Sequence, residues 1–440
     1  MARKEFHGER LKCARKLRAL TLTALAAETG ISKQSISLYE NGDNIPEYER
    51  GCRLATALNV PYDFFFQEDN CATITPVTYF RSLTTATKLD RTAQSLKLEF
   101  VAKAYEALST YLDFPALNLP KFDFVGNDDE FDSDANNMMV YDIERIASEL
   151  RSYWGIGMGP IKNLQYILES NGIIVTGFGA GDGKIDAFSQ RTTLTDSELC
   201  FIALDQGSKP EGRIRFDMAH ELGHLLLHPW SEELDSISKD EFRLRETQAN
   251  IFASAFLLPR ESFGKDAQLY PTDLKYYLWL KKKWKSSVQS MIYRSHQLGI
   301  ISSNQYQYMM RQVSKNGWRQ HEPDDCPYIL DENMFQGAID LLKDNHVLSI
   351  SGILSLLSEY GVSLFPEEIE DLLHLSRGSL VEEKQPANII QLKQIVKKDS
   401  SAGKEYEVKQ AARTFGTSSM DDTADLLKEF RRRKGNDFNT

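Results

Sequence analysis

The chain has 440 residues, of which 41% are hydrophobic and 26% are charged, which is typical of a folded protein of several domains and excludes wholesale disorder. The net charge of −11 argues against nucleic-acid binding by the chain as a whole. Apolar stretches such as 252–259 are much shorter than the ~20 residues of a membrane helix, and no apolar signal core follows Met1, so we expect a cytoplasmic protein without membrane contact.

The first segment, residues 1–70, differs from the rest in charge and pattern. Residues 1–60 carry ten Lys/Arg and seven Asp/Glu, so they are net positive within an acidic protein. A small-residue helix over 23–29 ends at Gly30, Ser32 is placed to cap a helix over 33–39, and a last helix is expected over 47–58. Two short helices joined by a glycine turn predict a helix-turn-helix DNA-binding domain.

The second helix of this pair carries the predicted base contacts, because its N-terminal side chains enter the major groove. The basic helix before it is expected to contact phosphates. The predicted DNA contacts are therefore Lys33, Gln34, Ser35 and Ser37 for bases, and Arg10, Arg15 and Arg18 for phosphates. A small helical bundle with no DNA role is the alternative.

This segment closely resembles the Xre, lambda-repressor-like helix-turn-helix family. The resemblance is carried by Leu25-Ala26, Gly30-Ile31-Ser32, Ile36-Ser37, Tyr39-Glu40-Asn41-Gly42 and Pro46. It implies double-stranded DNA as a partner and a homodimer on a palindromic operator.

The middle of the chain predicts a connector and then a compact α/β unit. Residues 71–140 are interpreted as a helical connector, with a helix over 84–112 and a loop over 114–137 that marks a domain boundary. Residues 141–262 are expected to begin with a helix over 141–154 and to include strands at 173–175, 185–188 and 199–204. The glycine-rich run 177–183 lacks a Walker lysine and is interpreted as a strand connection.

The strongest chemical signal is His220-Glu221-Leu222-Gly223-His224, within a helix expected over 214–228. Histidines four residues apart share a helix face and can bind one metal ion, and Glu221 is placed to accept a proton from water. Zinc needs a third protein ligand. We expect Glu246, at the start of a helix over 246–258, because His228 lies roughly 12 Å along the helix from His220.

The stretches 215–224 and 246–259 resemble the ImmA/IrrE metallopeptidase family. Position by position, the resemblance implies zinc ligands at His220, His224 and Glu246 and a catalytic glutamate at Glu221. Members of the family cleave helix-turn-helix repressors, often under DNA damage or during mobile-element induction. Segments 80–82 and 186–189 resemble the longer members, in which an Xre domain precedes the peptidase.

The C-terminal third contains no visible chemistry. Residues 263–325 predict a helical, helix-turn-helix-like subdomain, whose basic run 281–285 either contacts phosphate or is a solvated face. Residues 326–377 predict two or three further helices, and residues 378–440 a polar, flexible tail.

The sequence therefore predicts a multidomain, mainly α protein with one α+β zincin-like domain and an N-terminal DNA-binding domain. We expect a DNA-binding regulator with a zinc metalloendopeptidase of narrow specificity, which cleaves a regulatory protein or itself in a stress or mobile-element response. Manganese or iron also suits histidine and carboxylate ligands. The alternative is a transcription factor without catalysis, whose metal-binding domain serves sensing or dimerisation.

Overall fold

The computed structural model describes residues 5–67, 75–80, 87–122, 133–178, 187–194, 197–205, 209–228, 238–326, 328 and 333–382. All of them belong to one compact unit, residues 1–383. Most of the predicted tail lies outside the described residues. No helix in the described part of the chain combines the length and apolar character needed to cross a bilayer.

The N-terminal domain has the predicted helical pattern. Its helices are α1 (Gly8–Leu17), α2 (Leu22–Thr29), α3 (Lys33–Glu40) and α4 (Tyr48–Ala57), followed by the 3-10 helix η1 (Tyr62–Phe66). Gly30 ends α2 in the left-handed conformation at φ +68°, and the side chain of Ser32 accepts a hydrogen bond from the amide of Ser35. The turn between α2 and α3 is therefore built as the sequence indicates.

The predicted connector contains an element that the sequence analysis missed. Strand β1 (Thr75–Phe80) pairs antiparallel with β3 (Ala187–Leu194), so this segment supplies an edge strand to the sheet. The predicted helix over 84–112 is α5 (Lys88–Ser109), which begins with a capping box between Thr87 and Asp90. Helix α6 (Ser133–Tyr153) begins within the segment that was expected to be a loop.

The sheet has four strands in the order β1-β3-β4-β2. Strand β2 (Ile173–Phe178), preceded by α7 (Leu164–Ser170), runs parallel to β4 (Ser197–Asp205), whereas β3 runs antiparallel to β4. Of the predicted strand 185–188, residues 185 and 186 lie outside the described part, as does most of the glycine-rich run 177–183.

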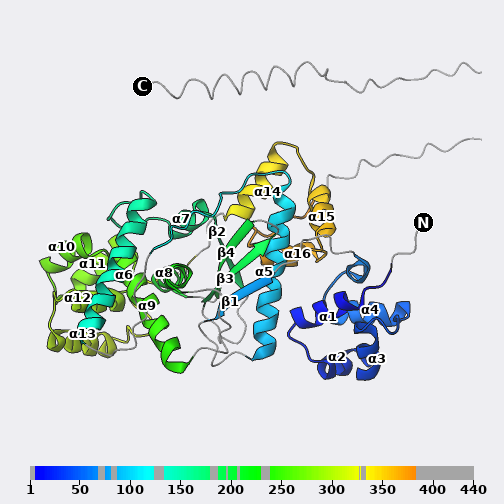
Figure 1. The fold of residues 1–440 in the computed structure, drawn as a ribbon, viewed down its shortest axis with the longest axis horizontal. Coiled ribbons are helices and arrows are strands. Elements are labelled where there is room, and N and C mark those ends of the chain that lie inside the picture. The colour runs from blue at the N-terminus through cyan, green and yellow to red at the C-terminus, as the bar shows by residue number, and fades with distance from the viewer. Residues whose placement is uncertain are drawn as a thin grey trace, which may run out of the picture. The chain divides into compact units, whose positions relative to one another are not determined.

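The sheet separates two hydrophobic cores. In β4, Leu199, Phe201 and Ala203 pack in the core shared with α5 and the N-terminal helices. The alternate residues Cys200, Ile202 and Leu204 pack in the core of α8 (Glu211–Leu227) and α9 (Lys239–Leu257). Figure 1 shows α5 and α8 on opposite sides of the strands. Because both faces are covered, residues 199–204 of β4 are all apolar.

The remaining helices follow the chain to residue 373. They are α10 (Arg260–Leu269), α11 (Leu274–Trp284), α12 (Val288–Gln297), α13 (Ser303–Lys315), α14 (Met334–Asp344), α15 (Ile350–Glu359) and α16 (Pro366–Leu373). Helices α10 to α13 pack in the same core as α8 and α9, and α14 to α16 pack in the core of α5. The molecule is thus mainly helical with one mixed sheet, as the sequence predicts.

Candidate metal centre and DNA-binding face

Helices α8 and α9 lie close together because α8 has a glycine at their contact. A Cβ atom on Gly223 would lie 3.1 Å from Cδ1 of Phe252 and 3.3 Å from the Cα of Ala249. Both atoms belong to α9. Helix α9 begins at Lys239, seven residues before the helix start that the sequence suggested, so Glu246 lies about two turns into it and faces α8.

Two histidines of α8 and one carboxylate of α9 converge. Nε2 of His220 lies 3.0 Å from Nε2 of His224, and the oxygens of Glu246 lie 3.6 Å and 3.2 Å from these two nitrogens. Tetrahedral zinc, with bonds of about 2.0–2.1 Å, separates its ligand atoms by about 3.3 Å. The two nitrogens and the two carboxylate oxygens therefore lie at spacings that suit ligands of one divalent metal ion.

The electrostatics of Glu246 also suit a cation. Burial raises the pKa of its carboxyl, but the hydrogen bonds and charge interactions with His220 and His224 together act more strongly and hold that pKa well below its ordinary range. The carboxylate is thus ionised at neutral pH, which is the form that binds a divalent metal ion.

Hydrogen bonds on the far side of each histidine orient its ring and favour a proton on Nδ1 when a metal ion is bound. Oδ1 of Asn250 accepts from Nδ1 of His220 at 3.0 Å, which places Nε2 of His220 among the converging donor atoms. Behind His224, His228 donates from Nε2 to Oε1 of Gln248 at 3.0 Å, so its Nδ1 accepts from Nδ1 of His224 at 2.8 Å. The second histidine therefore also directs Nε2 inward.

His228 is buried behind a ligand and does not face the converging donors. Burial is the larger cause, and the neighbouring His224 the second, that holds the pKa of His228 well below its ordinary value. The imidazole of His228 is therefore neutral. This placement agrees with the sequence argument that His228 is too far along the helix to be the third ligand.

Glu221 lies beside the two histidines. One of its carboxylate oxygens and one nitrogen from each histidine lie within 4.8 Å of one another. Its Oε2 accepts a hydrogen bond of 2.8 Å from the hydroxyl of Ser189 on β3. Ser189 and Ala187 share the sheet face that packs against α8, so the strand register determines where this hydroxyl points. The carboxylate of Glu221 is held in place on one oxygen.

The residues of α3 that the sequence predicts as base contacts are accessible, whereas two of the arginines of α1 predicted as phosphate contacts are not. Lys33 and Gln34 are exposed, and Ser35 and Ser37 are half-buried. Arg10 and Arg15 are buried, which contradicts their predicted phosphate contacts. Arg10 donates to the carbonyls of Phe64 and Gly361, at 3.1 Å and 2.9 Å.

Arg15 forms two hydrogen bonds of 2.6 Å and 2.7 Å with the carboxylate of Glu40, and therefore ties α1 to α3. Arg18 donates to the carbonyls of Leu58 and Asn59 and forms an ion pair of 2.5 Å with Glu368. These three arginines stabilise the fold. Charge clustering in the sequence did not reveal this, because their partners lie up to 351 residues away.

These features define a helix-turn-helix DNA-binding domain joined to a metallopeptidase-type domain. Comparison with known families confirms this combination. Residues 11–65 match the helix-turn-helix family, and residues 169–296 match the IrrE N-terminal-like domain. The second match runs from α7 into α12. A search of curated proteins found no match.

Ser189, Asn250 and Gln248 also contact the residues of this site, and none of them was among the predicted site residues. Asn250 lies four residues after Glu246, which places both on one helix face and was a readable signal. Ser189 carried no such signal, since only the sheet register directs it to Glu221.

Proposed function

We propose that this protein is a DNA-binding regulator with a zinc-dependent endopeptidase that cleaves a regulatory protein, a repressor or itself, in a stress or mobile-element response. The observation that carries the proposal is the convergence of His220, His224 and Glu246, with spacings of 3.0 to 3.6 Å, beside the carboxylate of Glu221. The match to the IrrE N-terminal-like domain supports it.

His220, His224 and Glu246 would hold the metal ion. Zinc held there would supply Lewis-acid chemistry, which would polarise a peptide carbonyl and lower the pKa of water to about 7. Glu221 accepts the proton of the attacking water and later donates it to the leaving amine. The hydroxyl of Ser189 holds one oxygen of Glu221, so the other oxygen is oriented for this transfer.

The DNA-binding part of the proposal depends on α3. We propose that Lys33, Gln34, Ser35 and Ser37 contact base edges, because α3 presents its N-terminal end on the surface of a helix-turn-helix domain. Arg10 and Arg15 are not among the proposed contacts, because both are buried. Because this domain resembles Xre regulators, we propose that the chain binds DNA as a homodimer. Light scattering of the full chain tests this by measuring its mass in solution.

The test of the peptidase is a comparison of the wild-type chain with Glu221→Gln. Both are purified, analysed for metal, loaded with zinc and incubated with candidate helix-turn-helix repressors. We expect about one zinc per chain in both proteins and cleavage only by the wild type. Glu261→Gln, which alters an exposed glutamate on α10, is the matched control and should cleave normally. Identical fragments from the wild type and Glu221→Gln would refute the mechanism.

A further inference from the structure

A cavity of about 490 Å³ lies against the N-terminal half of α8, between α12, α13 and the segment 318–325. Its apolar lining consists of Phe216, Tyr293, Tyr306, Met310 and Trp318. Aromatic side chains and a methionine provide a large apolar surface that adapts to the shape of a bound side chain.

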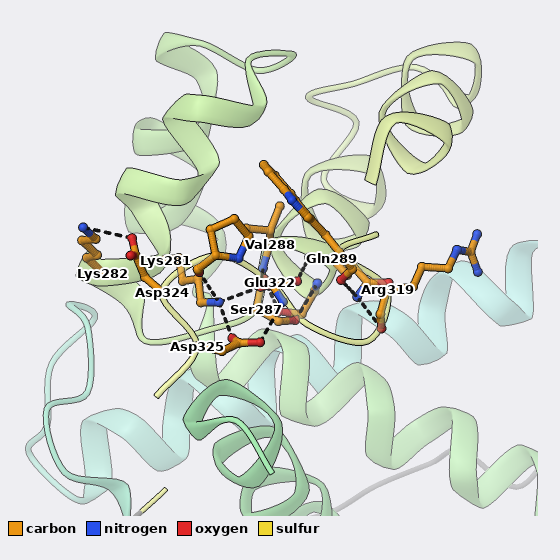
Figure 2. Close-up of polar contacts among 12 residues, drawn as sticks. Lys281, Lys282, Ser287, Val288, Gln289, Arg319, Glu322, Asp324 and Asp325 are labelled. Atoms are coloured by element: carbon orange, nitrogen blue, oxygen red, sulfur yellow. Dashed lines mark hydrogen bonds and ion pairs between the residues drawn. The ribbon is translucent and has the colours of Figure 1, made fainter. Parts of the chain in front are cut away.

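Three charged groups of this cavity, Lys281, Glu322 and Asp325, are paired with each other. Of its two arginines, Arg213 pairs with Asp217 at 3.2 Å and Arg319 donates to the hydroxyl of Ser314 at 2.6 Å. Glu322, which is buried, accepts hydrogen bonds from the amides of Val288 and Gln289 at 2.8 Å and 3.1 Å. The amino group of Lys281 lies 3.1 Å from the same carboxylate and also bonds to Asp325. Figure 2 shows Glu322 between Lys281 and the first residues of α12. The chain's own carboxylate thus occupies the N-terminal end of α12, so this helix end is not an anion site.

The same pairing extends to the other lysines of the basic run 281–285. Lys282 pairs with Asp324 at 3.1 Å, Lys283 with Asp266 at 2.7 Å and Lys285 with Glu211 at 3.1 Å. This neutralisation favours the interpretation of the run as the charged surface of a packing subdomain over a phosphate contact.

The cavity adjoins the metal centre along α8. Phe216 precedes His220 by four residues, so both lie on one face of the helix, and their ring centroids are 6.4 Å apart. An extended peptide advances about 3.3–3.6 Å per residue. One to three residues of an extended peptide, roughly 3–11 Å, are comparable to the 6.4 Å between the His220 ring and the Phe216 ring that lines the cavity.

The walls of the cavity are held in fixed positions. Gly212, at the start of α8, packs against the start of α12, where an added Cβ would lie 2.9 Å from the amide nitrogen of Ser287. The ion pairs of Lys281 and Glu322 join the segment after α13 to α11 and α12. The cavity is therefore preformed, which favours selective binding.

We propose that this cavity is the specificity subsite of the peptidase, and that it binds a large apolar side chain one to three residues from the cleaved bond. The proposal rests on the proposed function and specifies its substrate. The ligand is an extended segment of a protein substrate with Phe, Trp, Leu or Met at one position. The aromatic lining provides the selectivity, and the internally paired charges do not contribute to it.

The test uses the zinc-loaded full chain and pools of quenched-fluorescent decapeptides. In each pool one position carries a single defined amino acid and the other positions are mixed, and every position and amino acid is tested in turn. Met310→Glu places a charge in the cavity, and Tyr293→Ala removes part of its wall. Tyr308→Ala, which truncates a 57% exposed tyrosine of α13 outside the cavity, is the matched control. Zinc content and circular dichroism verify that each variant is folded.

We expect the wild type and Tyr308→Ala to prefer a large apolar residue over alanine by at least about tenfold in kcat/KM, at one position within three of the cleaved bond. In Met310→Glu and Tyr293→Ala the preference should fall below about threefold. Unchanged preference in both variants, or no apolar preference in the wild type, overturns the subsite.

A second measurement separates failure of the subsite from failure of the peptidase. The same pools are bound to the full-length Glu221→Gln chain, with and without Met310→Glu, and the retained peptides are sequenced. Enrichment of apolar residues among the retained peptides that is lost in the Met310→Glu variant supports the subsite. If the wild type at the same time cleaves no peptide, the peptidase activity is refuted but the subsite is not. No enrichment, or enrichment that Met310→Glu leaves unchanged, overturns the subsite whether or not cleavage occurs.

Discussion

Nδ1 of His228 lies 2.8 Å from Nδ1 of His224, and this contact determines which nitrogen of His224 is available to a metal ion. Gln248 holds the proton of His228 on Nε2, so Nδ1 of His228 is an acceptor. With a metal ion bound, His224 must then carry its proton on Nδ1, and its Nε2 faces the donors of His220 and Glu246.

We therefore expect His228→Ala to weaken zinc binding by about 10- to 100-fold, because the loss of such an outer partner frees the ligand ring to rotate and to change tautomer. Competition with a zinc-binding dye measures the affinity. His321→Ala, which alters an exposed histidine, should leave it unchanged. Equal affinities of His228→Ala and the wild type would show that His224 is oriented without this contact.

The second prediction concerns the glycine between α8 and α9. Gly223→Val should push α9 away, because the added atoms meet Phe252 and the backbone of Ala249. We expect a stability loss of about 1–3 kcal/mol from overpacking, together with weaker zinc binding as Glu246 moves away from the histidines.

Gly337→Val is the matched control, since Gly337 is a helical glycine with open space around its Cβ position. Urea denaturation and zinc titration measure both effects. Zinc affinity as high in Gly223→Val as in Gly337→Val would contradict the role given to this helix contact.

The third prediction is a pH dependence of stability from Glu169 on α7. Burial raises the pKa of this carboxyl to about 7, against opposing hydrogen bonds from Gln165 and the backbone of Met334. The folded state then keeps a proton that the unfolded chain loses at a lower pH. Stability should fall between about pH 4.5 and pH 7, by an amount on the order of 3 kcal/mol.

Glu169→Gln should remove this contribution, because a glutamine is neutral in both states. Urea denaturation of both chains at pH 5 and pH 8 measures it, and the variant should gain stability relative to the wild type only at pH 8. An equal difference at the two pH values would show that Glu169 does not titrate in this range.

The fourth prediction separates DNA reading from domain stability. Gln34→Ala should weaken specific DNA binding by about 1–3 kcal/mol without a change in melting temperature, because Gln34 is exposed on α3. Arg15→Ala should instead destabilise the domain by about 3–5 kcal/mol, since it leaves the buried carboxylate of Glu40 without its partner.

Fluorescence anisotropy with an operator selected by the wild type, and thermal denaturation, measure the two effects. If Arg15→Ala had normal stability but had lost DNA affinity, Arg15 would have to be a phosphate contact, in contradiction to its buried position.

The sequence alone determined the elements whose signals are local. Gly30 and Ser32 predicted the turn between α2 and α3, because conformational freedom and capping depend on neighbouring residues. His220 and His224 predicted a metal pair because an α-helix places residues i and i+4 on one face. Glu246 was predicted as a ligand from its own helix and from a family resemblance, without knowledge of how α9 packs.

Only the tertiary structure decided what depends on distant partners. Arg15 was predicted as a phosphate contact and is a buried partner of Glu40, because burial is a property of packing and not of charge pattern. Strand β1 was missed since its partner β3 lies more than 100 residues further along the chain. Ser189 reaches Glu221, and the apolar cavity forms beside Phe216, because the fold brings remote segments together, which no local pattern in the sequence specifies.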